Sequence, residues 1–309
     1  MRNLKIGVLI PCFNEEKTIG SVVKKLQNEL PDADIYVYDN NSNDRTSDVA
    51  RASGAVLRFE GRQGKGFVVR RMFADIEADI YVLIDGDDTY DVTSVHKLID
   101  YLCENNLDMV VGARIPMDDS CYPPGHTLGN KMFTRFVSLL FRKTFTDIFS
   151  GYRVFSRRFV KTFPCTSRGF EIELELTIRS LEMELPVGEI NAPYYARPIG
   201  SESKLSTIKD GSRILLKIFL LLKELRPVLF FSTISAIFFI CSLVLAFPLL
   251  KTYIDTGLVP RFPTAILSTG LMILAFLSLF LGVLLDSVSR SRKEVKYLAY
   301  LSNKSTSER

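Results

Sequence analysis

From residue 80 to residue 91 the chain reads Ile-Tyr-Val-Leu-Ile-Asp-Gly-Asp-Asp-Thr-Tyr-Asp, an apolar run that stops at a cluster of four carboxylates. A short apolar run bounded by polar residues is typical of a buried parallel strand. The carboxyl ends of such strands form the edge at which open α/β sheets bind ligands. Because side chains alternate along an extended segment, we expect Asp85 and Asp87 to point the same way, with Gly86 admitting a ligand close to the backbone.

Asp85 and Asp87 are candidate metal ligands. Carboxylate oxygens with no His or Cys nearby suit Mg²⁺ or Mn²⁺, which proteins typically bind through one or two carboxylates together with substrate phosphates. The alternative is a solvated acidic turn, a common feature of loops. The position directly after a buried strand favours the metal site.

The rest of the first half of the chain alternates strands with helices. The apolar runs 4–10, 35–38, 55–59 and 109–111 predict four more strands, and amphipathic stripes such as 19–30 predict helices between them. Right-handed crossovers then gather the carboxyl ends of the strands along one edge. The sequence therefore predicts an α/β fold with a mostly parallel, doubly wound sheet.

Polar residues collect at this predicted edge in the pattern of a nucleotide-diphosphate site. A carboxylate such as Asp39 can accept hydrogen bonds from a base or a ribose, and Lys65 adds a positive charge between Gly64 and Gly66, which would let the backbone close on a phosphate. A plain turn is the alternative for Gly-Lys-Gly, since the full phosphate-loop spacing is missing. The other residues expected at this edge are Asn14, Glu15 and Arg114.

The ordered motifs resemble those of family 2 glycosyltransferases with the GT-A fold. They are Pro11-Cys12-Phe13-Asn14-Glu15, Asp39-Asn40-Asn41-Ser42, Gly64-Lys65-Gly66 and Asp85-Gly86-Asp87. The stretches 146–156, 169–173 and 197–205 are similar to the polyprenyl-phosphate branch of that family, which holds dolichyl-phosphate mannose synthases and bactoprenol glucosyl transferases. The resemblance covers about two thirds of the chain in motifs, and also the two apolar runs near its end.

The resemblance implies a role for each matching residue. Asp85, Asp87 and Arg197 are expected to be catalytic, with Asp87 as the metal ligand and Asp85 as its partner. Thr89 stands where mannose synthases commonly have Gln, which leaves the second protein ligand of the metal open. The donor nucleotide-sugar set is Pro11, Asn14, Glu15, Asp39, Asn41, Lys65, Asp85, Gly86 and Glu171, and the acceptor-phosphate set is Arg114, Lys131, Arg153, Ser203 and Lys204.

Two uncharged apolar runs, 227–250 and 263–285, each exceed the roughly 20 residues that cross a hydrocarbon core as helix. Lys and Arg flank the outer ends of the pair, so the positive-inside rule predicts a multi-pass protein of a bacterial inner membrane with both termini in the cytoplasm. The predicted organisation is a GT-A domain (1–208), an amphipathic juxtamembrane helix (209–226), a two-helix transmembrane hairpin (227–285) and a cytosolic tail (286–309). A linker helix packed on the domain is the alternative for 209–226.

The composition agrees with this assignment. Of 309 residues 47% are hydrophobic, and the five cysteines include no CxxC pair, which indicates reduced thiols and no zinc site. The formal charge of +4 comes without a basic, aromatic-interleaved tract, so nucleic acid is not an expected partner.

A donor site held at a membrane predicts a lipid acceptor, polyprenyl (undecaprenyl) phosphate, whose phosphate is already a nucleophile. Direct displacement would invert the anomeric centre. A UDP-hexose such as UDP-glucose is preferred over GDP-mannose on the bacterial resemblance, and the product is expected to serve envelope glycans such as lipopolysaccharide. The resemblance also implies a homo-oligomer, such as a tetramer.

Three alternative functions fit the sequence less well. A processive polysaccharide synthase carries a Gln-x-x-Arg-Trp motif, whereas this chain has no Trp. A non-catalytic membrane-anchored adaptor that binds nucleotide-sugar would not need carboxylates that only a cation can neutralise. A lipid hydroxyl acceptor would need a general base, and the sequence offers no dedicated one.

Overall fold

The computed structural model of the chain describes residues 4–118, 134–135, 137, 141, 145–198, 219–220 and 222–304. The chain divides into two compact units, each with its own internal packing. The first is Met1–Gly211 together with Tyr297–Arg309, and the second is Ser212–Lys296.

The first unit is built on a seven-stranded sheet in the order β3-β2-β1-β4-β6-β5-β7. Neighbouring strands pair in parallel, except that β6 runs antiparallel to both β4 and β5. The predicted α/β fold with a mostly parallel sheet is therefore confirmed. The strands are β1 (Ile6–Cys12), β2 (Asp34–Asp39), β3 (Val56–Phe59), β4 (Ile80–Leu83), β5 (Met109–Pro116), β6 (Arg153–Ser156) and β7 (Val187–Tyr194).

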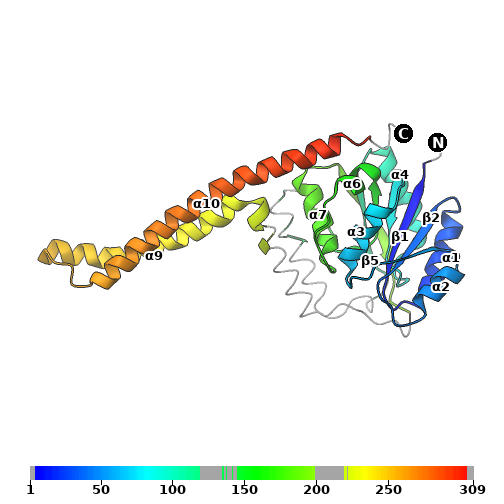
Figure 1. Cartoon of the computed structure of the whole chain (residues 1–309), viewed down its shortest axis with the longest axis horizontal. Helices are drawn as coiled ribbons and strands as arrows, with labels where there is room; N and C mark the ends of the chain where they lie inside the picture. Colours follow the sequence, from blue (N-terminus) through cyan, green and yellow to red (C-terminus); the bar gives the residue numbers. More distant parts are fainter. Residues whose placement is uncertain are drawn as a thin grey trace. The chain divides into compact units, whose positions relative to one another are not determined.

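Helices cover both faces of the sheet (Figure 1). Apolar side chains of α1 (Ile19–Glu29), α2 (Thr46–Ala52) and α4 (Val95–Glu104) share one core with alternate residues of β1 and β4. On the other face lie α3 (Lys65–Asp75), α6 (Arg157–Thr162) and α7 (Ile172–Glu182). There the ring of Phe73 on α3 packs edge-on against Phe155 of β6, with their centroids 5.6 Å apart.

This arrangement decides which way the acids after β4 face. Ile80, Val82 and Ile84 belong to the core shared with α1 and α4. By alternation, Tyr81 and Leu83 face α3, and so does Asp85. The catalytic carboxylates predicted from the sequence thus lie at the carboxyl end of β4, on the side of α3 and α7.

Two parts of the sheet differ from the prediction. The strands β6 and β7 were not predicted from the sequence, and β6 inserts between β4 and β5. The predicted fifth strand, 109–111, continues to Pro116, so Arg114 lies within β5 and not after it. The strand is longer because each of its residues pairs in register with β7, from Met109–Val187 to Pro116–Tyr194.

The second unit contains α9 (Pro227–Thr256) and most of α10 (Phe262–Leu301), two helices long and apolar enough to cross a membrane. Gly257, with a φ of 70°, ends α9 in the left-handed conformation that glycine adopts without strain. Both helices extend beyond the predicted spans 227–250 and 263–285. Most of the predicted amphipathic helix 209–226 lies outside the described residues.

Small polar residues join α9 to α10. Ser242 donates a hydrogen bond to the backbone carbonyl of Ser268 (2.8 Å), and Ser268 donates one to that of Ser242 (2.9 Å). Further along, a Cβ on Gly282 would lie 2.9 Å from Cβ of Phe231, so the backbones approach closely there. Small residues at a helix contact and paired hydroxyls are typical of helix association in membranes.

Candidate active site

Gly86, between the two candidate metal ligands, is held by close packing on both sides. Its carbonyl accepts a hydrogen bond from Thr18 Oγ1 (2.7 Å). A Cβ at this position would lie 2.5 Å from Glu15 Oε2 and 2.6 Å from Cys12 Sγ. Only glycine fits at position 86, because Cys12 at the end of β1 and Glu15 in the loop after it occupy the space of a Cβ. The same packing places the predicted donor residue Glu15 directly beside the acids.

Asp87 is buried, with 3% of its surface exposed. Its Oδ1 accepts a hydrogen bond from Thr89 Oγ1 (2.6 Å), and its Oδ2 forms an ion pair with Arg197 Nη2 (2.6 Å). Burial raises the pKa of Asp87, as does the nearby charge of Asp85, while Arg197 and Thr89 oppose that rise. Thr89 thus orients Asp87, which is the role the structure gives to the residue at the position of the family's Gln.

Asp85 is held by a cation from α3. Lys65 Nζ lies 2.5 Å from Asp85 Oδ1 and 2.5 Å from Glu173 Oε1 on α7. Coulombic attraction to both carboxylates raises the pKa of Lys65 although burial opposes it, so Lys65 is an ammonium at neutral pH. Burial raises the pKa of Glu173, and Lys65 opposes that rise. Glu173 was not predicted as a site residue; its signal is that it alternates, with Glu175, between the apolar residues of the stretch 172–178.

The two glycines beside Lys65 contact protein backbone. A Cβ on Gly64 would lie 2.2 Å from the carbonyl oxygen of Arg168, and one on Gly66 would lie 2.3 Å from that of Ser167. The backbone N–H of Gly66 donates a hydrogen bond to the Arg168 carbonyl (3.1 Å). Close packing on the segment before α7 therefore accounts for both glycines, and their closure on a phosphate stays a prediction.

The loops after β1 and β2 are joined by hydrogen bonds that place the predicted base-reading residue. Asp39 is buried, and its Oδ1 accepts from the backbone N–H of Ser42 (2.9 Å). Asn14 Oδ1 accepts from the backbone N–H of Asn43 (2.7 Å), and Asn41 Nδ2 donates to the Gly61 carbonyl (2.6 Å). Pro11 pairs with Tyr38 in the register of β1 and β2. The structure therefore brings the predicted donor residues of these loops to the same edge as Asp85.

Of the predicted acceptor residues, Arg114 lies on β5 and is paired with an acid. Its Nε and Nη2 donate to the two carboxylate oxygens of buried Asp147, at 2.6 and 2.8 Å. The guanidinium also lies over the ring of Tyr194, 5.5 Å from its centroid. Lys131, Ser203 and Lys204 lie outside the described residues.

Arg153 requires a correction, because the structure places it in the core. It is fully buried, and its guanidinium donates to the carbonyls of Ser150 (2.9 Å) and Ile148 (2.8 Å) and to Thr177 Oγ1 (2.9 Å). Burial lowers its pKa to about 10. Arg153 ties β6 to α7 and to the loop before β6, so its side chain is not a phosphate ligand.

Glu171, predicted to line the sugar pocket, precedes α7 and is only partly buried. Its Oε1 accepts from the backbone N–H groups of Arg168 (3.0 Å) and Gly169 (3.1 Å). Glu171 thus shapes the turn that carries Glu173 toward Lys65.

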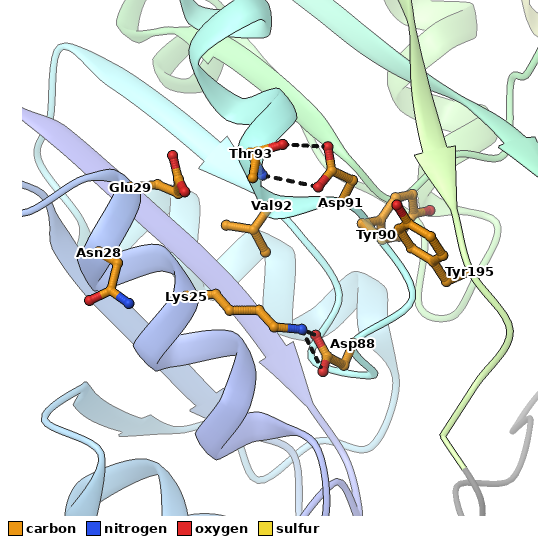
Figure 2. A pocket seen from close by; sticks show the side chains of 9 residues that line it. All are labelled: Lys25, Asn28, Glu29, Asp88, Tyr90, Asp91, Val92, Thr93 and Tyr195. Atoms are coloured by element: carbon orange, nitrogen blue, oxygen red, sulfur yellow. Dashed lines mark hydrogen bonds and ion pairs between the residues drawn. The ribbon is translucent and has the colours of Figure 1, made fainter. Parts of the chain in front are cut away.

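The other two acids of the 85–91 cluster turn away from this site. A cavity of about 450 Å³ lies between α1 and the segment after β4, and Figure 2 shows the side chains around it. Asp88 points toward α1, where its Oδ1 lies 2.7 Å from Lys25 Nζ. Asp91 accepts hydrogen bonds from Thr93 and Ser94 and so caps the short 3₁₀ helix Val92–Ser94. Of the four carboxylates, Asp85 and Asp87 therefore belong to the candidate site, whereas Asp88 and Asp91 stabilise the segment that follows it.

The chain belongs to glycosyltransferase family 2, in agreement with its fold and its paired carboxylates. The sequence profile of the family "Glycosyl transferase family 2" matches residues 7–163. Glycosyltransferase AglJ of Haloferax volcanii is 32% identical over 232 residues, which are 74% of this chain and 76% of AglJ. A dolichyl-phosphate hexose transferase of the same organism is 29% identical over 209 residues, 68% of this chain and 90% of that protein.

Solved structures confirm the GT-A fold. Glucosyl-3-phosphoglycerate synthase from Mycobacterium tuberculosis, in complex with Mn²⁺ and UDP-glucose, superposes with a TM-score of 0.57 at 23% identity. The match covers 72% of this chain and 79% of that one. The predicted family and fold are thus both confirmed.

Proposed function

We propose that this chain is a membrane-bound, inverting hexosyltransferase that moves a sugar from a nucleotide-diphosphate sugar to polyprenyl phosphate at the cytoplasmic face of the membrane. The observation that carries the proposal is the pair Asp85 and Asp87 at the end of β4 in a chain that also has two helices long enough to span a membrane. The dolichyl-phosphate hexose transferase relative supports a polyprenyl-phosphate acceptor. The UDP-glucose complex of the structural neighbour supports a UDP-sugar donor.

A divalent cation, Mg²⁺ or Mn²⁺, fits the side chains present. Asp85 and Asp87 offer carboxylate oxygens, the hard ligands these ions prefer. Among the described residues no group of three or more His, Cys, Asp or Glu side chains is arranged to hold a metal. We expect these two acids to hold the ion, with donor phosphates adding further oxygen ligands. A bound cation would offset the negative charge of the departing diphosphate.

The chain's own residues then supply orientation and charge. Asp39 would accept hydrogen bonds from the nucleotide, and Glu15, beside Gly86, lies next to the acids. Arg197, which already reaches Asp87, is the cation placed to hold an acceptor phosphate. A phosphate monoester is largely dianionic at neutral pH and attacks the anomeric carbon without a protein base. A single displacement of this kind inverts the anomeric configuration.

The membrane arrangement follows from the distribution of charge. Lys and Arg flank the outer ends of the two apolar helices, which favours a cytoplasmic catalytic domain with both termini on the same side. A site held there would meet a lipid phosphate at the interface, and the product would supply envelope glycan modification. Homo-oligomerisation is part of the same proposal.

Transfer assays in detergent test the proposal directly. Undecaprenyl phosphate, Mg²⁺ or Mn²⁺ and a panel of radiolabelled UDP- and GDP-sugars would be incubated with wild type, Asp87→Ala and Asp88→Ala. We expect one donor to give a metal-dependent, butanol-extractable, mild-acid-labile glycolipid, reduced at least about 100-fold by Asp87→Ala. Asp88→Ala is the matched control, because Asp88 pairs with Lys25 and should leave most of the activity.

Two results would refute the proposed function. Donor binding without any labelled lipid would point to a different acceptor or to a nucleotide-sugar-binding adaptor. A labelled product in which the anomeric configuration of the donor is retained would exclude direct displacement.

A further inference from the structure

A single buried lysine lies between two carboxylates in the donor site. Lys65 Nζ is 2.5 Å from both Asp85 Oδ1 and Glu173 Oε1. The side chains of Lys65 and Glu173 are 9% and 5% exposed, whereas that of Asp85 is 25% exposed. Asp85 is therefore the member of this cluster that faces outward, and Glu173 lies behind it.

One ammonium shared by two carboxylates leaves the cluster with a net negative charge. A lysine paired with Asp85 alone would neutralise that acid and make it a poorer ligand for a cation. Because Glu173 places a second negative charge beside Lys65, the ammonium does not cancel the negative potential around Asp85. Buried charges interact strongly in a low-dielectric environment, so this sharing affects any cation that approaches Asp85.

The position of Glu173 is fixed by its burial in α7. It lies in the first turn of α7, in which every residue from Ile172 to Leu181 is buried. Its Oε2 finds no hydrogen-bond partner within the part of the chain that the structure describes. A buried carboxylate with an unpaired oxygen is costly, and such groups are commonly retained at functional sites. Packing of Gly64 and Gly66 against Ser167 and Arg168 fixes Lys65 from the other side.

We propose that Glu173 is a positioning residue of the donor site, which draws Lys65 toward α7 and so leaves Asp85 oriented and negatively charged for a divalent cation. This inference rests on the proposed function only in requiring that a cation binds at Asp85 and Asp87. It assigns Lys65 to the positioning of Asp85, in place of the phosphate contact predicted from its sequence neighbours.

Mn²⁺ alone, titrated into the full-length protein and followed by electron paramagnetic resonance, tests the inference. We expect Glu173→Gln to weaken Mn²⁺ binding about 10-fold, because Lys65 then neutralises Asp85 alone. The double variant Lys65→Met/Glu173→Gln removes both charges and leaves Asp85 as an uncompensated acid. Mn²⁺ affinity in the double variant should return to the wild-type value or exceed it.

This rescue separates charge sharing from a purely structural role. If Glu173 only supported the fold, or ligated the metal itself, the double variant would bind Mn²⁺ at least as weakly as Glu173→Gln, and the inference would be overturned. An unchanged affinity in Glu173→Gln, or wild-type Mn²⁺ binding that Asp87→Asn does not reduce, would also overturn it. Glu182→Gln, on the same helix but paired with Arg179, is the matched control and should not change the affinity.

The outcome is independent of the transfer assay. The expected Mn²⁺ pattern in a protein that transfers no sugar to lipid phosphate would refute the proposed function and leave the inference standing. Metal-dependent transfer to lipid phosphate, without recovery of Mn²⁺ affinity in the double variant, would refute the inference and leave the proposed function standing.

Discussion

Gly151→Ala is the substitution that most directly tests the placement of Asp85. A Cβ at residue 151 would lie 2.3 Å from Asp85 Oδ2 and 2.9 Å from its Cγ. Ordinary contacts begin near 3.4 Å, so the carboxylate would have to move by about 1 Å. The backbone cannot easily yield instead, because the Gly151 N–H donates a hydrogen bond to the Tyr90 hydroxyl (2.8 Å) in the core. The Asp85 carboxylate, tied to Lys65, must therefore give way.

A displacement of about 1 Å in a catalytic group costs on the order of 100-fold in rate. We expect Gly151→Ala to lose about that much transfer activity, and overpacking to lower the free energy of unfolding by roughly 1–3 kcal/mol. Transfer rate and thermal unfolding would be measured on the same detergent preparations. Gly61→Ala is the control, since its Cβ would meet only Phe59, at 3.9 Å. A folded Gly151→Ala protein with activity within threefold of wild type, a threshold of about 0.7 kcal/mol, would refute the argument.

Three further predictions concern neighbouring residues. Arg197→Met should tighten Mn²⁺ binding severalfold while abolishing transfer, and weaker Mn²⁺ binding would contradict this. Arg153→Met leaves the buried carbonyls of Ser150 and Ile148 without their hydrogen-bond donor and should destabilise the fold by about 3 kcal/mol or more. The effect should appear as a lower melting temperature and not as a selective rise in the KM for the acceptor. Tyr300→Phe removes a 2.6 Å hydrogen bond to buried Asp108 and should cost roughly 1–3 kcal/mol in thermal unfolding, with donor KM unchanged.

The first half of the fold was predictable because each strand ends at a polar cluster. The apolar runs before Asp39 and Asp85 are continuous, and the parallel strands they form bring both acids to the same edge. β6 and β7 gave no such signal. β6 is only four residues long and begins with Arg153, while β7 contains Glu189, Asn191 and Pro193, which strands usually avoid.

The site residues that the sequence analysis missed or misassigned depend on tertiary packing. Arg153 resembles a phosphate-binding arginine in its motif, but its burial in the core is decided by the antiparallel insertion of β6. Glu173 reaches Lys65 only because the fold brings the first turn of α7 to the start of α3, although the two residues are 108 positions apart in the chain. No local pattern encodes a contact across that separation. The acids at strand ends and the cations Lys65 and Arg197 were found from the sequence, whereas Glu173 and the pairing of each cation with its acid were not.

The two acids of the candidate metal site are each paired with a cation from another element of the chain. Close carboxylates repel each other when buried, so the folded edge is stable only if each has a partner. Lys65 partners Asp85 and is 9% exposed, whereas Arg197 partners Asp87 and is 26% exposed. A divalent cation that binds Asp87 competes with Arg197 for Oδ2, and the more exposed side chain is the one able to leave. We therefore expect metal binding to release a guanidinium beside the reacting groups, where an incoming phosphate needs one.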